Sequence, residues 1–469
     1  MQNFLETSRR DPEKIDVAER LQNFEEIYRF FNNRQVRKQA ERCVQCGDPF
    51  CTTIGCPLQN HIPQWLEAIA ARDLERAFLL SNESSPFPEI LGRVCPQGIL
   101  CEGACTLNDG HGAITIGAIE ASITDLAFNA GLQLPYPGIR HEPKVAVIGS
   151  GPAGISCAHF LLRAGIGVDM YERAERPGGL LTYGIPGFKL DKGLIDRRFK
   201  LLRKAGLDLH LQQEIGETLE LETLQEKYAA IFVGIGATKG KRAGIKGEEL
   251  PEVIPAMEYL TCKQHQIFGA EVDARYNLRD KRVVVIGGGD TAMDCLRTAM
   301  RDGAESVSCL YRRDMANMPG SRKEYHNAVE EGVEFRFNLS PREIRIKNHR
   351  LGIEVEKTQL GEADEDGRQR VEIIPGSRRW ITADVVIPAL GFEPEGLPGL
   401  LDAGVECDQR GRVKIDPASG VTSNPKIYAG GDCYRGADLV VTAAADGRRA
   451  ALAMMQKLLN RVSGLPAGV

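Results

Sequence analysis

The chain has 469 residues, a formal net charge of -5 and a pI near 6.0. This length is too great for one compact core and predicts several domains. The acidic balance argues against nucleic acid or an anionic membrane as a partner. No run approaches the roughly 18 apolar residues of a membrane span, and the charged start lacks an export signal's apolar region, so we expect a cytoplasmic protein.

The number and spacing of the cysteines indicate metal or redox chemistry. A chain with 13 cysteines outside an oxidising compartment uses them for metal or redox chemistry more often than for disulfides. Seven lie close together, as Cys43-x2-Cys46-x4-Cys51-x4-Cys56 and Cys95-x5-Cys101-x3-Cys105. A helical stretch predicted at residues 62–80 would fold the two groups together. Two 4Fe-4S clusters take one ligand more than these thiolates supply. A structural zinc site is the alternative, and it would leave three thiols unused.

A proline-rich linker at residues 132–138 predicts a new domain from about residue 141. The apolar strand 144–148 runs directly into Gly149-x-Gly151-x-x-Gly154 and a helix, and the next strand ends in Glu172. This pattern is typical of a dinucleotide fold, in which the pyrophosphate lies at the helix N-terminus and the acid binds a ribose. An ordinary glycine turn is the alternative.

The pattern then repeats. Residues 282–286 run into Gly287-x-Gly289-x-x-Ala292, and the strand 306–311 ends in Arg312-Arg313 instead of an acid. A carboxylate would repel a 2'-phosphate, whereas paired guanidinium groups hold it by charge-assisted hydrogen bonds. The second site therefore favours NADPH over NADH. The alternative is a solvated arginine pair, partly neutralised by Asp314.

A third glycine-containing motif lies near the C-terminus. The apolar residues 427–429 meet Gly430-Gly431-Asp432, and a helix is predicted after Gly436. In reductases with two dinucleotides such a segment follows an inserted pyridine nucleotide domain and completes the flavin site. Asp432 would lie near the flavin's sugar chain, and a helix start at 438–442 would stabilise negative charge on reduced flavin. A simple turn is the alternative for the glycine pair.

This order of motifs resembles the small subunit of bacterial NADPH-dependent glutamate synthase over nearly the whole chain. Residues 178–189 (GGLLTYGIPGFK) and 317–323 (NMPGSRK) are especially similar to that family. The same module resembles the N-terminal part of dihydropyrimidine dehydrogenase and the large subunit of electron-bifurcating transhydrogenases. The resemblance implies an α/β fold with two Rossmann-like, glutathione-reductase-like domains and an N-terminal α-helical iron-sulfur domain. Its implied boundaries are 1–140 for iron-sulfur, 141–254 and 384–469 for FAD, and 255–383 for NADPH.

The resemblance also assigns ligands. It implies that Cys43, Cys46, Cys51 and Cys105 hold one 4Fe-4S cluster, and that Cys56, Cys95 and Cys101 hold the other. Glu120 aligns with a glutamine that completes the second cluster in dihydropyrimidine dehydrogenase, although a solvated helix acid is its alternative reading. The predicted residues of the FAD and NADPH sites are Gly149, Gly151, Pro152, Ala153, Gly154, Glu172, Gly179, Leu180, Gly287, Gly289, Asp290, Thr291, Ala292, Arg312, Arg313, Gly391, Gly431, Asp432 and Thr442.

The resulting functional hypothesis is electron input without a catalytic side chain. NADPH would give a hydride to FAD, and single electrons would pass through the clusters to a glutamate synthase large subunit, which makes L-glutamate from L-glutamine and 2-oxoglutarate. A hetero-oligomer is expected. The six isolated cysteines lack the Cys-x-x-Cys of a flavin disulfide reductase. Alternatives are a ferredoxin-type or bifurcating reductase with another partner, and a scaffold with vestigial nucleotide sites.

Overall fold

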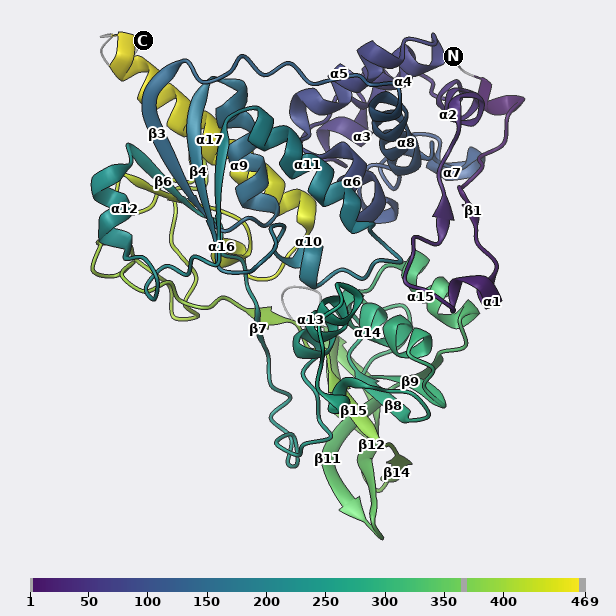
Figure 1. Cartoon of the computed structure of the whole chain (residues 1–469). Helices are drawn as coiled ribbons and strands as arrows, with labels where there is room; N and C mark the ends of the chain where they lie inside the picture. Colours follow the sequence, from purple (N-terminus) through teal and green to yellow (C-terminus); the bar gives the residue numbers. More distant parts are fainter. Residues whose placement is uncertain (1–2, 364–368, 464–469) are drawn as a thin grey trace.

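The structure is a computed structural model that describes residues 3–363 and 369–463, with side chains described up to residue 459 (Figure 1). An N-terminal group of helices lies beside a parallel sheet, and a second parallel sheet forms a separate lobe. This confirms the predicted α/β class with an N-terminal helical part. Within the described residues, no helix has both the length and the apolar character needed to cross a membrane.

The helical part buries an apolar core that includes Trp65 and Phe78, both fully buried. One helix predicted at 62–80 is in fact two, because Arg72 adopts a left-handed φ of 69° and the Asp73 side chain caps the next helix by accepting a hydrogen bond from Arg76 N. The elements are η1 (Asn3–Leu5), β1 (Glu13–Lys14), α1 (Val17–Arg20), β2 (Tyr28–Arg29), α2 (Asn33–Ala40), α3 (Phe50–Thr53), α4 (Ile62–Ala70), α5 (Leu74–Ser84), α6 (Pro88–Val94), η2 (Gln97–Ile99), α7 (Asn108–His111) and α8 (Ile116–Asn129).

The first parallel sheet has the strand order β17-β6-β3-β4-β5. Every residue of β4 is buried, as expected for a parallel strand covered on both faces. The C-terminal β17 pairs with β6, so the end of the chain returns to the sheet that residue 141 begins. The elements of this part are β3 (His141–Ile148), α9 (Pro152–Arg163), β4 (Ile166–Glu172), α10 (Leu180–Tyr183), α11 (Lys192–Lys204), β5 (Leu207–Leu211), α12 (Leu221–Lys227), β6 (Ala230–Val233), β17 (Ile427–Ala429), α16 (Asp432–Arg435) and α17 (Val440–Ser463).

The second parallel sheet has the order β10-β9-β8-β15, and a small antiparallel sheet of β11, β12, β13 and β14 projects from its lobe (Figure 1). The predicted boundary between residues 383 and 384 falls just before β15, which pairs with β8 of this second sheet. The elements are α13 (Ala256–Ile267), η3 (Ala274–Tyr276), β8 (Arg282–Ile286), α14 (Asp290–Arg301), β9 (Ser306–Tyr311), α15 (Arg322–Glu330), β10 (Glu334–Phe337), β11 (Leu339–Lys347), β12 (Arg350–Ala363), β13 (Gln369–Ile373), β14 (Arg379–Thr382) and β15 (Val385–Pro388).

Two features join the lobes. The short strands β7 (Lys239–Gly240) and β16 (Phe392–Glu393) pair where the chain leaves and re-enters the first lobe. The N-terminal segment also reaches the second lobe, where Arg20 forms a buried ion pair with Glu331 at 3.0 Å. The N-terminal part of the chain therefore contacts the second lobe as well as lying beside the first sheet.

Candidate cofactor sites

The first glycine motif forms a tight turn between β3 and α9. A Cβ on Gly149, whose φ is 94°, would lie 2.5 Å from the Gly234 carbonyl oxygen, and one on Gly154 would lie 2.0 Å from the Gly149 carbonyl oxygen. These two glycines are therefore required by backbone packing. A Cβ on Gly151, the residue preceding α9, would meet nothing within 4 Å. That open space at a helix N-terminus can accept a pyrophosphate.

Glu172 ends β4 beside this turn, as the motif predicts. Its carboxylate accepts hydrogen bonds from Ser150 N at 3.0 Å and Ala174 N at 2.9 Å, and also from the Ser150 hydroxyl. The Ser150 hydroxyl in turn accepts a hydrogen bond from Gly178 N. Glu172 thus holds the glycine turn directly and, through the Ser150 hydroxyl, also holds the start of the 178–189 segment.

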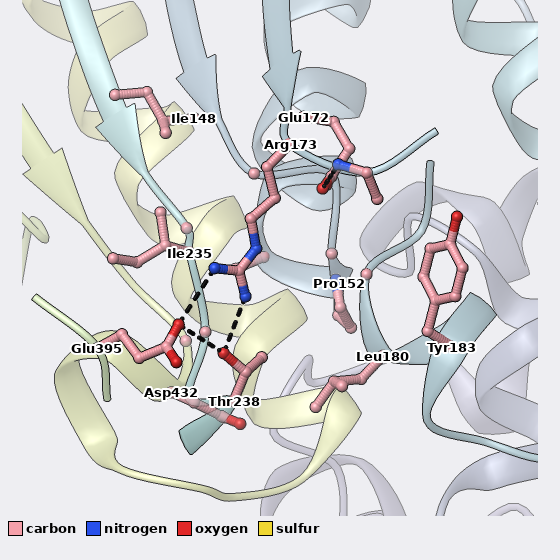
Figure 2. A pocket seen from close by; sticks show the side chains of 18 of the residues that line it. Ile148, Pro152, Glu172, Arg173, Leu180, Tyr183, Ile235, Thr238, Glu395 and Asp432 are labelled. Atoms are coloured by element: carbon pink, nitrogen blue, oxygen red, sulfur yellow. Dashed lines mark hydrogen bonds and ion pairs between the residues drawn. The ribbon is translucent and has the colours of Figure 1, made fainter. Parts of the chain in front are cut away.

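A cavity of about 820 Å³ opens in front of this turn, a volume within the range of cofactor sites. Figure 2 shows Pro152, Leu180, Tyr183 and Asp432 around it. The predicted residues that line the cavity are Gly149, Gly151, Pro152, Ala153, Glu172, Gly179, Leu180, Gly431 and Asp432. Gly154, Gly391 and Thr442 are not among the lining residues, and the Thr442 hydroxyl instead donates to the Leu439 carbonyl oxygen at 2.7 Å.

Three of the cavity residues that were not predicted form a polar network. Arg173 donates hydrogen bonds to Glu395 at 3.1 Å and Thr238 at 3.0 Å, and Thr238 also donates to Glu395 (Figure 2). The three come from β4's end, the segment after β6 and the segment after β16, so only tertiary structure brings them together. Their polar network borders the part of the cavity next to Glu172.

The C-terminal motif supplies a further part of the wall, where Gly431 lies against Ala153 of the first motif. Asp432 accepts a hydrogen bond from Asp438 N at 3.3 Å, and Leu439 and Val440 line the cavity where α17 begins. Burial raises the pKa of the Asp432 carboxyl to about 7, and the neighbouring Asp438 and Asp446 carboxylates act in the same direction. The start of α17 presents backbone N–H groups to this region, which favours a negatively charged ligand there.

The second glycine motif repeats the backbone geometry of the first. A Cβ on Gly287 would lie 2.3 Å from the Ala389 carbonyl oxygen, whereas one on Gly289, which precedes α14, would meet nothing within 4 Å. In the first turn of α14, Asp290 accepts a hydrogen bond from Ser321 N, which fixes the 317–323 segment against the turn. Thr291 and the buried Ala292 continue this helix start.

The arginine pair follows β9, where a 2'-phosphate would lie. Arg312 is exposed, and Arg313 donates to the Gln369 carbonyl oxygen at 3.2 Å. Asp314 accepts from Asn317 N and Nδ2, both at 2.9 Å, and no ion pair between Asp314 and either arginine occurs among the described residues. The carboxylate that could have neutralised the pair is therefore turned toward Asn317, and this observation fits a phosphate ligand.

The seven N-terminal cysteines separate into two groups around two small cavities. Cys43, Cys46, Cys51 and Cys105 line one of them. Cys56, Cys95 and Cys101 line the second, together with Glu120, Asn60 and Gln97. This grouping is the one that the resemblance implies, although the ligand assignment itself remains a prediction. Asn60 and Gln97 were not anticipated from the spacing of the cysteines.

The donor sets fit iron-sulfur clusters. Burial raises the pKa of the Cys43 and Cys56 thiols to about 11 and that of Cys51 to about 12. Thiols with raised pKa values become thiolates readily only when a metal binds them, and two groups of four and three cysteines suit two iron-sulfur clusters better than one tetrahedral zinc site. Glu120 is also buried, and burial raises its carboxyl pKa to about 8. It is therefore not a solvated helix acid.

One helix forms part of two walls. Val440 and Ala443 of α17 line the large cavity, and Val441 lines the second cysteine cavity. Arg448, further along α17, donates to the Leu58 carbonyl oxygen at 2.8 Å and to the Ser84 carbonyl oxygen at 3.4 Å. The second cysteine cavity therefore lies directly beside the large cavity, and the first cysteine cavity has no wall from α17.

Comparisons with known proteins agree with this arrangement. Residues 20–132 match the family model of dihydropyrimidine dehydrogenase domain II, 4Fe-4S cluster, and residues 143–447 match that of pyridine nucleotide-disulphide oxidoreductase. Mycobacterium tuberculosis FprA in complex with NADPH has the same fold, with a TM-score of 0.56 and 20% identity over 70% of this chain and 88% of that one. The fold and sites define a flavin- and iron-sulfur-dependent NADPH oxidoreductase.

Two sequence relatives narrow this class. The chain is 47% identical over 454 residues to the glutamate synthase (NADPH) small chain of Halomonas elongata, covering 95% of this chain and 96% of that one. It is also 47% identical over 456 residues to the putative oxidoreductase AegA of Escherichia coli, covering 95% of this chain and 69% of AegA. The chain belongs to the family of glutamate synthase small chains, which confirms the resemblance noted in the sequence.

Proposed function

We propose that the chain is the electron-input subunit of a glutamate synthase, in a cytoplasmic hetero-oligomer with a large subunit that forms L-glutamate from L-glutamine and 2-oxoglutarate. The single observation that carries the electron path is the first turn of α17, which lines both the large cavity and the second cysteine cavity. The name of the Halomonas elongata relative supports the assignment to glutamate synthase.

The cofactors supply hydride acceptance and one-electron transfer when bound, and the chain's residues position them. The large cavity would hold FAD, with its pyrophosphate at Gly151 and its ribose at Glu172. The turn at Gly289 and the exposed Arg312 would hold NADPH. The two cysteine cavities would hold one 4Fe-4S cluster each, with Glu120 as the ligand that the seven cysteines do not provide.

The proposal is tested by reconstitution. The purified chain, mixed with a glutamate synthase large subunit, should form glutamate from glutamine and 2-oxoglutarate only when NADPH is present. The chain alone should bleach its flavin with NADPH and form no glutamate. A complex that forms no glutamate, although its flavin is reduced by NADPH, would exclude this partner while leaving the reductase assignment intact.

A second candidate function rests on AegA, which is as similar to this chain as the Halomonas elongata protein and extends beyond the matched region. AegA is named a putative oxidoreductase, and we infer from it that this chain could serve an oxidoreductase other than glutamate synthase. Under this alternative, ferredoxin or another small carrier would replace the large subunit. This alternative would be favoured if NADPH reduced such a carrier, through the chain, faster than the chain passed electrons to the large subunit.

A further inference from the structure

Asn60 occupies a central place in the second cysteine cavity, in the turn between α3 and α4. Its side chain is 3% exposed, so it has no bulk water to satisfy its amide. The Nδ2 group donates to Glu120 Oε1 at 2.7 Å, and Oδ1 accepts from the Ser84 hydroxyl at 3.2 Å. Both ends of the amide are therefore fixed, and its donor is directed at the one carboxylate on this cavity.

The position of Asn60 along the chain brings it to the same centre. It follows Cys56 within the segment between α3 and α4, and both residues line this cavity. The Asn60 carbonyl oxygen accepts from the Thr52 hydroxyl at 2.9 Å, and Thr52 follows Cys51 of the first cavity. One residue thus connects Glu120 with the chain next to the first set of cysteines.

This geometry leaves one oxygen of Glu120 for a metal. Oε1 is bound to Asn60, and no hydrogen bond to Oε2 occurs among the described residues. A carboxylate held through one oxygen presents the other as a single ligand. A hydrogen bond to a ligating carboxylate also withdraws negative charge from it, which makes the metal centre easier to reduce.

We propose that Asn60 is a positioning residue for the second cluster, orienting Glu120 as a one-oxygen ligand and raising the reduction potential of that cluster. The inference rests on the proposed cluster site. Removing a residue that hydrogen-bonds a metal ligand typically changes the metal affinity by about 10- to 100-fold. We therefore expect Asn60→Ala to lower the reduction equilibrium constant of the second cluster about tenfold, which corresponds to about 59 mV for one electron.

The test is a redox titration of the purified full chain, followed by the electron paramagnetic resonance signal of each cluster. The Asn60→Ala chain should show the negative shift at the second cluster only, with the first cluster and the FAD content unchanged. Selective loss of the second cluster, with about four irons and the FAD retained, would support the same conclusion through affinity. An unchanged potential with full iron content would overturn the proposal.

A double-mutant cycle separates positioning from packing. In a Glu120→Cys chain the carboxylate is gone, so adding Asn60→Ala should no longer shift the second cluster's potential. An equal shift in both backgrounds, or loss of both clusters from Asn60→Ala, would show that Asn60 only supports the fold. Thr124→Val is the matched control, because Thr124 donates to the backbone oxygen of Glu120 and not to its carboxylate. If Glu120→Ala itself keeps both clusters, the proposed ligand fails independently of Asn60.

Discussion

Val440 lines the large cavity, and Val441, the next residue of the chain, lines the second cysteine cavity. A flavin bound in the first of these would therefore be adjacent to a cluster bound in the second, and a cluster in the first cysteine cavity, which α17 does not line, would lie further along the proposed path. We expect the Cys46→Ala chain, with only the second cluster, to reduce both its flavin and that cluster with NADPH.

The Cys95→Ala chain, with only the first cluster, is the matched variant. It should bleach its flavin at the normal rate while the first cluster stays oxidised, because the intermediate carrier is missing. Rapid mixing with NADPH, followed by freeze-quench spectroscopy, distinguishes the two chains once each is shown to hold about four irons. Equal rates of cluster reduction in both chains would contradict this order.

Glu120 is predicted to be a ligand, and iron content tests it directly. Glu120→Ala should reduce the iron from about eight to about four per chain, and Glu120→Cys should restore it. Gln97 is the control, because its side chain lines the same cavity and already donates to the Gly92 carbonyl oxygen at 2.9 Å. Loss of iron from Gln97→Ala, with full iron in Glu120→Ala, would assign the oxygen ligand to Gln97.

Gly151 and Gly154 should respond differently to alanine. Gly151→Ala adds a methyl group only to the open space before α9, so the apo-protein should keep its stability while FAD affinity falls by at least about tenfold, or 1.4 kcal/mol. Gly154→Ala forces a contact with the Gly149 carbonyl oxygen, and we expect it to destabilise the apo-protein by about 1–3 kcal/mol. Urea unfolding and flavin titration measure the two effects. Equal destabilisation by both changes would mean that the space at Gly151 is not a ligand site.

Arg312 should determine the preference for NADPH. Charged hydrogen bonds contribute about 1.5–3 kcal/mol, so Arg312→Ala should lower kcat/KM for NADPH by about 10- to 100-fold and leave the value for NADH nearly unchanged. Both kcat/KM values can be measured by steady-state reduction of a dye that accepts electrons from the flavin, with NADPH or NADH as the donor. Arg336→Ala is the control, since Arg336 pairs with Glu334 on β10 and should affect neither nucleotide. A parallel loss with NADH would show that Arg312 supports the fold instead.

Asp432 should make the apo-protein less stable at higher pH. Its folded pKa is about 7 and its ordinary value is 3.8, so the folded state binds more protons between these values and stability falls as pH rises through that window. Asp432→Asn should therefore be more stable than the unmodified chain at pH 8, with the difference disappearing below about pH 4.

Asp416 serves as the control, because its carboxyl should change the pH dependence of the unfolding free energy in the opposite direction. Hydrogen bonds from Ser419 lower the pKa of its carboxyl, so its contribution is present above the ordinary pKa and is lost in acid. Asp416→Asn should thus be slightly less stable than the unmodified chain at pH 8. Urea unfolding of the flavin-free proteins at several pH values measures both, and a destabilised Asp432→Asn at pH 8 would contradict the assignment.

The sequence could predict the α/β fold and the two glycine turns, because a short turn fixes its glycines through local backbone geometry. Gly149 and Gly287 have the same clash with a neighbouring strand that only glycine avoids. The break near Arg72 was missed because it depends on one left-handed residue and one capping acid within an otherwise helical pattern. Asp73 was the available signal, since aspartate favours a helix N-cap.

The parts of the site that could not be predicted depend on long-range packing. Arg173, Thr238 and Glu395 meet only after the sheet has formed, and nothing in their local sequence indicates the network. Asn60 lies in a loop beside Cys56, and nothing in the local sequence indicates that its partner is Glu120, on the distant helix α8. Thr442 was expected at the flavin, but the helix turns its hydroxyl back to Leu439.

The hydrogen bonds of Arg448 join segments that the ribosome synthesises at very different times. Its partners Leu58 and Ser84 are separated from it by 390 and 364 residues. At about 5–20 residues per second, the ribosome makes those partners on the order of tens of seconds before it makes α17. During that interval Cys56, Cys95 and Cys101 already exist, but Val441 is not yet there to close their cavity. The growing chain therefore passes through a stage in which this cavity lacks one wall, and its last helix completes that wall.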